Sequence, residues 1–208
     1  MDTRQAYNLW SQQYDANDNK TRDLEAVAFR AALEHVSFDT SLEIGCGTGK
    51  NTRWLLTRSK RLVAVDLSEG MLAVARRELA SKHVTFVQAD IRSEWSFAAG
   101  RFDLVTFSLV LEHIEDLDHV FKQAAGKVKR GGHVYIGELH PFKQYTGTKA
   151  RFDTEEGPQT VPCFNHNISD FTGAATRNGF AIADVNEHFD DDDRTSVPRI
   201  LTLVLRRL

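Results

Sequence analysis

A chain of 208 residues, 41% of them apolar, is long enough for one domain with a substantial core and short for two. Its 26 basic and 29 acidic residues give a formal net charge of -3, so the overall field attracts neither a phosphate backbone nor an anionic membrane. Two cysteines, Cys46 and Cys163, are too few for a disulfide framework, and neither a signal core nor a membrane-length apolar run is present. We therefore predict one cytoplasmic domain over residues 1–208.

The first 38 residues predict two helices. A segment with aromatic residues, from Tyr7 to Tyr14, precedes apolar positions that repeat at helical spacing from Leu24 to Ala32. These helices lead directly into a glycine-containing stretch.

From residue 41 onward, apolar strand patterns alternate with helical ones. The expected strands are Ser41–Ile44, Arg61–Val65, Val84–Gln88, Phe102–Phe107 and His133–Gly137. Three helices are expected between these strands. The first begins near Lys50, the second spans Glu69–Ala80 with Ser68 as its N-cap, and the third has one apolar stripe from Leu117 to Val128. Alternation of this kind predicts right-handed crossovers and a parallel sheet covered on both faces.

The last part of the chain breaks the alternation. After a helix capped by Ser169, strands Phe180–Glu187 and Arg199–Arg206 are joined only by a short acidic loop, so we expect them to pair antiparallel. The second strand is apolar on both faces, which favours an interior position. The fold class is therefore α/β: a three-layer, doubly wound, Rossmann-like sheet, mostly parallel, with one antiparallel strand in a C-terminal hairpin. Glu138–Asn167 is expected to be irregular.

Three glycines at alternate positions, Gly45, Gly47 and Gly49, follow the first strand. In a doubly wound sheet this turn lies where ligands bind, and the missing side chains permit a tight bend, close ligand approach and close helix packing. Asp66 ends the second strand 21 residues after Gly45, where a carboxylate can accept hydrogen bonds from a ribose. Asp90, after the third strand, adds a second acid, so an adenosine-containing ligand is predicted.

The glycine spacing indicates which ligand of this kind to expect. G-x-G-x-G differs from the G-x-G-x-x-G pattern that cradles a pyrophosphate, and the Gly-Lys-Ser/Thr ending of a P-loop is absent. Glu43, two residues before Gly45, suits a ligand with an ammonium group rather than phosphates. An NAD-dependent oxidoreductase is therefore disfavoured.

With these motifs, the sequence resembles the class I S-adenosylmethionine-dependent methyltransferases of the small-molecule type, from Leu42 to about Glu138. The resemblance implies S-adenosylmethionine as cofactor and S-adenosylhomocysteine as product, with residues 1–38 as a helical cap over the cofactor cleft and 39–208 as the core. Asp66 would hold the ribose hydroxyls, Met71 would pack on the adenine, and Asp90 and Ile91 would contact that base. The implied cofactor-binding residues are Glu43, Gly45, Cys46, Gly47, Gly49, Asp66, Leu67, Met71, Asp90, Ile91, Ser108, Tyr14 and Arg22.

Methyl transfer from a sulfonium is an in-line displacement, so positioning and a dry pocket are the main catalytic resources. A base is needed only where the acceptor is protonated. The candidates at the carboxyl ends of strands are His140, Glu138 and His113, with His188 further along. We place His140 first, because it precedes Pro141 at the start of the long loop, and expect His140→Ala to reduce turnover with cofactor affinity preserved.

The acceptor itself is not specified by the sequence. We expect a small molecule, with no nucleic acid or membrane partner and no metal. A protein or peptide acceptor and a non-catalytic binding module remain as alternatives. The acidic run Asp190–Asp193 is expected on the ligand side, where a solvated turn is favoured over a metal site or attraction of a cationic substrate. Residues that either line the acceptor pocket or form ordinary loop surface are Lys149, Arg151, Phe152, Phe164 and His166.

Overall fold

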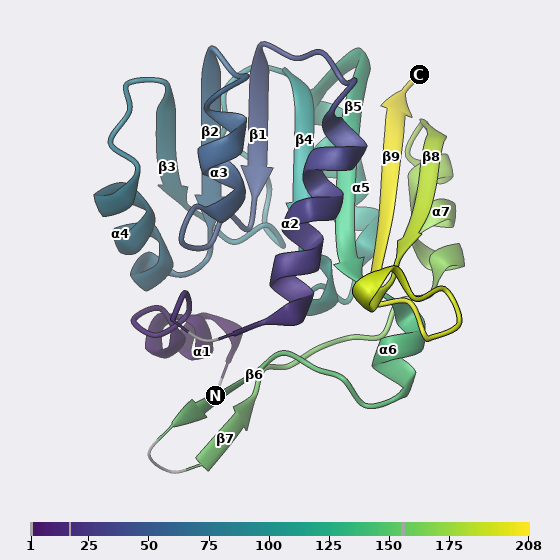
Figure 1. The fold of residues 1–208 in the computed structure, drawn as a ribbon. Coiled ribbons are helices and arrows are strands. Elements are labelled where there is room, and N and C mark those ends of the chain that lie inside the picture. Colours follow the sequence, from purple (N-terminus) through teal and green to yellow (C-terminus); the bar gives the residue numbers. More distant parts are fainter. Residues whose placement is uncertain (1, 17, 155–156) are drawn as a thin grey trace.

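The computed structural model describes residues 2–16, 18–154 and 157–208. A seven-stranded sheet has the order β3-β2-β1-β4-β5-β9-β8. Its strands are β1 (Thr40–Ile44), β2 (Arg61–Asp66), β3 (Val84–Gln88), β4 (Phe102–Ser108), β5 (Val128–Leu139), β8 (Phe180–His188) and β9 (Ile200–Arg207). Neighbouring strands are parallel except at β9, which runs antiparallel to both β5 and β8. The predicted fold class is confirmed, including the interior position of the reversed strand (Figure 1).

Helices cover both faces of this sheet. One layer contains α2 (Lys20–Leu33), α3 (Lys50–Leu55) and α4 (Glu69–Glu78), and the other contains α5 (Leu117–Lys127) and α7 (Ile168–Arg177). Strand alternation explains the arrangement: on β5, Val134 and Ile136 join the core beneath α5 and α7, whereas Tyr135 packs with Phe29 of α2. Alternate residues along each strand thus contact the helices on opposite faces of the sheet.

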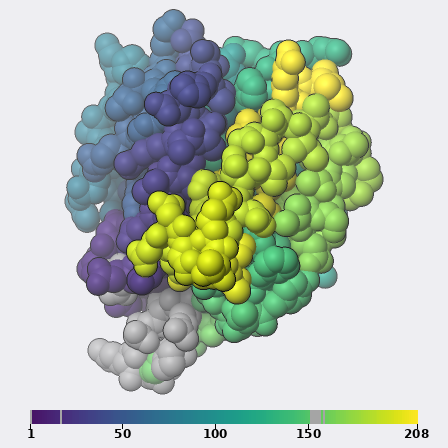
Figure 2. Space-filling model, turned by 45° about the vertical axis from the view of Figure 1, so that its right-hand side comes forward, coloured from purple at the N-terminus to yellow at the C-terminus, as the bar shows by residue number. Residues whose placement is uncertain are grey.

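Shorter elements lie at the carboxyl edge of the parallel strands, the lower edge in Figure 1. They are α1 (Thr3–Trp10), α6 (Pro141–Tyr145) and the hairpin of β6 (Arg151–Thr154) and β7 (Gly157–Thr160). The segment between β8 and β9 reaches the same edge, where Figure 2 shows it beside the N-terminal part of the chain. A hydrogen bond of 3.1 Å from Arg199 Nη1 to Thr21 Oγ1 joins the start of β9 to α2.

The N-terminal residues divide differently from the expected cap of residues 1–38. Phe29 and Leu33 of α2 are fully buried against Tyr135 and Val204, so α2 belongs to the helical layer of the sheet. Only α1 and the turn after it lie over the carboxyl edge. The α2 helix packs on the sheet because its apolar stripe is buried only when it contacts other apolar side chains there.

Three local expectations are corrected. β5 begins at Val128 rather than His133, because the strand continues through Gly131 and Gly132 with a shift of register against β4. The N-cap of α7 is Asn167 rather than Ser169, and the carboxylate of Asp170 accepts the Asn167 amide at 2.7 Å. The stretch expected to be irregular contains α6, β6 and β7. The predicted N-cap Ser68 does accept the amide of Met71, at 3.1 Å.

Candidate active site

The glycine turn after β1 is held by backbone geometry that other residues rarely adopt. Gly45, Gly47 and Gly49 have φ of 71°, 54° and 93°. A Cβ on Gly45 would lie 2.8 Å from Val110, whereas a Cβ on Gly47 would project into open space. The main chain at Gly47 is thus left accessible to a ligand, as the sequence predicted for that position.

Asp66, at the end of β2, organises this turn. Its Oδ2 accepts the Gly47 amide at 2.8 Å and its Oδ1 accepts the Ser68 amide at 2.8 Å. Burial raises the pKa of this carboxyl, while these backbone hydrogen bonds oppose the change. The carboxylate therefore ties the glycine turn to the start of α4 and also faces the cavity described next.

A cavity extends from the glycine turn to the ends of β2, β3 and β4. It contains nine of the predicted cofactor-binding residues and one predicted catalytic residue. These are Tyr14, Gly45, Gly47, Asp66, Leu67, Met71, Asp90, Ile91, Ser108 and His113. In this cavity wall, the carboxylate of Asp90 is also bound by Arg92, whose Nη2 lies 2.6 Å from Oδ2. The sheet edge has thus brought together residues from separate strand ends.

A second, narrower cavity continues from Tyr14 past Gly45 and Gly47, beneath α2 and α3. Its wall includes the predicted residues Arg22, Glu43 and Cys46. Gly49 lies outside both cavities, on an open groove beside Lys50 and Arg53. The structure therefore brings together all the predicted cofactor-binding residues except Gly49, whose φ supports the start of α3.

Two buried carboxyl groups, the guanidinium of Arg22 and the ammonium of Lys50 are the charged groups that line this second cavity. Glu43 accepts Thr52 Oγ1 at 2.6 Å, and burial raises its pKa to about 8. Glu25 accepts Asn51 Nδ2 at 3.0 Å and the hydroxyl of Tyr135 at 3.1 Å, and burial raises its pKa as well. Arg22 lies 4.7 Å from the ring centroid of Tyr14. Acidic and basic groups in one narrow cavity suit a ligand that carries both an ammonium and a carboxylate.

The segment after β4 separates the cavities. Leu109 has φ of 53°, a left-handed conformation that is unusual for leucine. Glu138 of β5 accepts the amides of Val110 at 3.0 Å and Leu111 at 2.9 Å, and burial raises its pKa to about 8. Glu138 is not among the residues lining the cavities. It therefore holds the backbone of the Ser108–His113 segment in place.

His113 and Tyr7 form a hydrogen-bonded pair in the wall of the first cavity. Tyr7 Oη lies 2.8 Å from His113 Nε2, and His113 Nδ1 lies 2.8 Å from the carbonyl oxygen of Pro162. Because a carbonyl only accepts, Nδ1 carries the proton in the neutral ring, and Nε2 accepts from the Tyr7 hydroxyl. Burial raises the pKa of Tyr7 well above its ordinary value. Tyr7 therefore supplies a hydroxyl whose proton points at a base.

The other predicted base candidates have a different environment. His140 is completely buried, with Nε2 2.9 Å from Glu187 Oε1 and Nδ1 accepting the Phe142 amide at 3.2 Å as the cap of α6. His188 Nε2 lies 3.0 Å from Thr202 Oγ1. Neither histidine lines the cavities described above, and these partners favour a structural role for both.

A third cavity, of about 290 Å³, lies on the other side of the Tyr7 and Tyr14 rings. It shares Tyr7, Tyr14 and Leu109 with the first cavity. Lys149 is among its lining residues. Phe164 and His166 do not line the cavity, and the side chains of Arg151 and Phe152 lie outside the described part of the structure. His166 instead bonds the carbonyl oxygen of Ile114, at 2.7 Å.

The acidic run Asp190–Asp193 lies on the ligand side of the sheet. Asp190 accepts two hydrogen bonds from Arg199, at 2.5 and 2.6 Å, and Asp193 accepts the hydroxyl of Thr195. Among the described residues, no group of three or more acidic, histidine or cysteine side chains is arranged to hold a metal ion. These contacts hold the acidic run as a loop just before β9.

Several residues at these cavities were not identified individually from the sequence. Tyr7 was only the first residue of an aromatic segment, and Glu25 and Leu109 were not singled out. Arg22 and Glu25 are three residues apart on α2, which places them on one helix face, and this spacing is a signal that was available. The Tyr7–His113 pair spans 106 residues, so no local pattern announces it.

Comparisons with known proteins agree with this geometry. Residues 42–136 match the model of the methyltransferase domain family. A malonyl-[acyl-carrier protein] O-methyltransferase from Enterobacter lignolyticus is 33% identical over 173 residues, which cover 83% of this chain and 68% of that protein. An uncharacterized methyltransferase from Emericella nidulans is 25% identical over 228 residues, covering 89% of this chain and 78% of the relative. The crystal structure of an S-adenosylmethionine-dependent methyltransferase from Mesorhizobium loti superposes with a TM-score of 0.72 at 25% identity, covering 88% and 98% of the two chains.

Fold, site and relatives together define the class: the chain belongs to the class I S-adenosylmethionine-dependent methyltransferases. It is a methyltransferase enzyme whose methyl donor is S-adenosylmethionine. The residues fit this donor, because Gly47 leaves the main chain open and the buried Asn51 Oδ1 has no hydrogen-bond partner among the described residues. Within those residues, no helix combines the length and apolarity needed to span a membrane.

Proposed function

We propose that this enzyme methylates a small molecule that binds in the third cavity. The observation that carries the proposal is the shared wall: Tyr7, Tyr14 and Leu109 each face both this cavity and the one containing Asp66. S-Adenosylmethionine supplies an electrophilic methyl group for in-line displacement. The chain's own part is then to hold the nucleophile on line and to exclude water.

The Tyr7–His113 pair is the proposed means of removing a proton from the acceptor. An acceptor hydroxyl or amine that donates to Tyr7 Oη passes its proton to that oxygen, while the Tyr7 proton moves to His113 Nε2. The Nδ1 contact with Pro162 keeps the ring oriented, and Glu112 Oε1 lies 3.9 Å from Nε2. This arrangement makes His113 a catalytic base that acts through Tyr7, whereas Glu138 is a positioning residue.

The alternatives are a protein or peptide acceptor and a binding module without turnover. Coverage of the site by α1 and by residues 148–150 supports a small acceptor over a protein chain. The relative from Enterobacter is named for O-methylation of a malonyl group on acyl-carrier protein, which supports a small acyl or similar acceptor. Turnover with release of S-adenosylhomocysteine separates an enzyme of this kind from a binding module.

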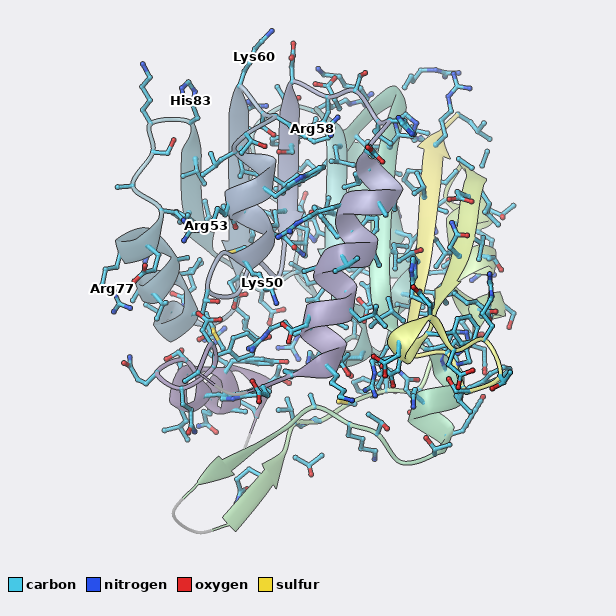
Figure 3. All side chains as sticks on the ribbon, viewed as in Figure 1. Lys50, Arg53, Arg58, Lys60, Arg77 and His83 are labelled. Atoms are coloured by element: carbon cyan, nitrogen blue, oxygen red, sulfur yellow. The ribbon has the colours of Figure 1, made fainter. Side chains whose placement is uncertain are left out.

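Nucleic acid is disfavoured as an acceptor by the way the basic residues are used. Figure 3 labels cations along α3, α4 and the opposite sheet edge. Several have carboxylate partners, such as Lys50 with Asp23 at 2.5 Å and Lys60 with Asp39 at 2.9 Å. Arg58 instead stacks on Trp54, with its guanidinium 5.0 Å from the ring centroid. Such pairing leaves little of this surface for phosphates.

Cytoplasmic location stays a prediction, supported by the free thiols of Cys46 and Cys163.

Two variants test the proposal. A metabolite screen that monitors S-adenosylhomocysteine provides an acceptor, and Tyr7→Phe and His113→Gln are then compared with the unmodified enzyme. We expect turnover to fall by about 10²–10⁴-fold, the usual contribution of general base catalysis, with product affinity changed far less. Tyr145→Phe, at an exposed tyrosine on α6, is the matched control. Full turnover in both active-site variants would contradict the proposed base.

A further inference from the structure

We propose that the acceptor is a small molecule with an apolar or aromatic body and an anionic group, a carboxylate or a phosphate. This inference rests on the proposed function, because it specifies what the third cavity accepts. The cavity has one wall of aromatic rings next to Leu109 and a mouth lined with amines. Its two ends therefore select for different parts of one molecule.

The aromatic wall is built by α1 and the turn that follows. Tyr7 and Trp10 stack with ring centroids 5.7 Å apart, and Tyr14 meets Trp10 edge-on at 4.8 Å. Leu109 and Leu139 complete the apolar part of the lining. A flat or aliphatic group buried against these surfaces gains free energy from the contact. Because Tyr7 and Leu109 also face the cofactor cavity, this is the end at which the nucleophile must lie.

The mouth of the cavity carries an excess of positive charge. Lys20, Lys149 and Arg199 line it, against the exposed carboxylate of Asp18. Within the described part of the chain, neither lysine has a carboxylate inside salt-bridge distance. Two exposed ammonium groups that approach one cavity from α2 and from the segment before β6 are suited to bind an anion.

The remaining charges do not cancel this excess. Arg199 is bound by Asp190, and that carboxylate also lies 3.9 Å from Lys143, so basic groups outnumber acidic ones around it. Asp191–Asp193, the rest of the acidic run, are not lining residues. Glu112 also lines the cavity, but its side chain is buried, unlike the two ammonium groups at the mouth, and burial raises its pKa. A cationic acceptor would thus meet two ammonium groups before it reached any buried acid.

Binding of simple probes to the enzyme loaded with S-adenosylhomocysteine tests this specificity. Titration calorimetry compares 3-phenylpropionate, phenyl phosphate, 3-phenylpropanamide and 2-phenylethylammonium. We expect at least one anionic probe to bind about tenfold or more tightly than the neutral amide, the usual worth of a charge-assisted contact, and the cation to bind weakest. The two anions distinguish a carboxylate from a phosphate site. Equal affinity for the four probes, or preference for the cation, would overturn the proposal.

Lysine variants locate the effect. Lys20→Gln with Lys149→Gln should reduce the preference for the anion over the amide to about twofold or less, while affinity for the amide stays within about twofold. Lys82→Gln, next to His83 at the opposite edge of the sheet (Figure 3), is the matched control and should retain the full preference. A preference that survives in the double variant would also overturn the proposal.

The two proposals fail in different ways. Release of S-adenosylhomocysteine with a neutral or cationic metabolite, but not with anionic ones, leaves methyl transfer to a small molecule intact and removes the anionic acceptor. Absence of product with any small metabolite removes the proposed function, whatever the probes bind.

Discussion

A single carboxylate determines the local shape of the cofactor site. Asp66 accepts amides from both Gly47 and Ser68, so it fixes the glycine turn and the first turn of α4 with one side chain. From the sequence, it is predicted to bind the ribose of the cofactor. In the structure, its side chain holds two segments, the glycine turn and the start of α4, and loss of the side chain removes both contacts.

We therefore expect Asp66→Ala to weaken S-adenosylhomocysteine binding by about 10–100-fold, since each hydrogen bond to a charged group is worth about 1.5–3 kcal/mol. Titration calorimetry on the folded variant provides the measurement. Asp103→Ala is the control, because Asp103 bonds Thr40 and Lys129 at the opposite sheet edge and should affect stability alone. Unchanged affinity in Asp66→Ala would contradict the assignment.

His140 and His113 differ in what their loss should change: we expect loss of His113 to reduce turnover and loss of His140 to reduce stability. His140 is buried and bonded on both ring nitrogens, so His140→Ala should lower the free energy of unfolding by about 1–3 kcal/mol. Turnover per folded molecule should stay within about twofold, contrary to the expectation from sequence. Urea denaturation and a turnover assay on the same preparation separate the two effects. A large loss of turnover without loss of stability would restore His140 as the base.

At the residue scale, the sequence predicted what backbone spacing controls. Glycines and acids at strand ends must meet at one edge of a parallel sheet, so Gly45, Gly47, Asp66 and Asp90 could be placed together. The base could not be chosen in the same way, because every histidine after a strand satisfies that criterion. Side-chain direction and partners distinguish His113 from His140, and these depend on contacts between distant segments.

At the scale of elements, α1 is attached to the core through a few polar contacts. Asn8 Oδ1 accepts Ser68 Oγ at 2.7 Å and the Gly70 amide at 3.0 Å, both at the first turn of α4. The aromatic rings of Tyr7, Trp10 and Tyr14 pack mainly with one another and with Val161. The α1 helix is thus held by the first turn of α4, by the Tyr7–His113 hydrogen bond and by Val161, outside the main core of the sheet.

Asn8→Ala should loosen α1 without unfolding the sheet. Loss of a capping contact of this kind costs about 0.5–2 kcal/mol. Hydrogen exchange should therefore accelerate at the amides of α1, by a factor of about 2–30, and remain unchanged in β1 and β4. Asn178→Ala, on the far side near α7, is the control and should leave α1 unaffected. Faster exchange in β1 and β4 would show that α1 does not move separately.

The order of elements was largely predictable, whereas the stretch from Glu138 to Asn167 was not. Alternating apolar patterns gave each sheet strand because one face of every strand meets a helix layer. The α6 helix and the β6–β7 hairpin are short, so few periodic positions mark them. Likewise, β5 extends past Gly131 and Gly132 because its neighbour β4 pairs with Val128, a contact that sequence patterns do not contain.

At the scale of the whole molecule, buried carboxyl groups concentrate around the cofactor edge. Burial raises the pKa of Glu43 and of Glu138 to about 8, and that of Glu25 and Glu112 also rises. In contrast, hydrogen bonds from Lys129 and Thr40 lower the pKa of Asp103 to about 2 despite partial burial, so the stability that this carboxylate contributes is present at neutral pH and is lost only in acid. Two groups at the edge that contains the glycine turn, Glu43 and Glu138, therefore titrate near neutral pH.

A group whose pKa is raised in the fold binds its proton more tightly there than in the unfolded chain. Between its ordinary value of 4.5 and about pH 8, Glu138 therefore lowers the free energy of unfolding as pH rises. Glu138→Gln removes this dependence, so its stability relative to the unmodified protein should increase with pH from 5 to 8. Urea denaturation across this range tests the sign, with exposed Glu94→Gln as control. If the difference in free energy of unfolding between Glu138→Gln and the unmodified protein does not change with pH, the raised pKa of Glu138 is contradicted.

The order of the sheet also has a consequence for synthesis on the ribosome. β9 follows β8 in the chain but lies between β5 and β8, so β8 cannot join the sheet until residues 200–207 have emerged from the exit tunnel. Until then β5 presents an unpaired edge, and the apolar face of α7 lacks part of its support. A nascent chain of this enzyme thus remains incomplete until its C-terminal strand inserts, and this late step is the one most exposed to chaperones and to aggregation.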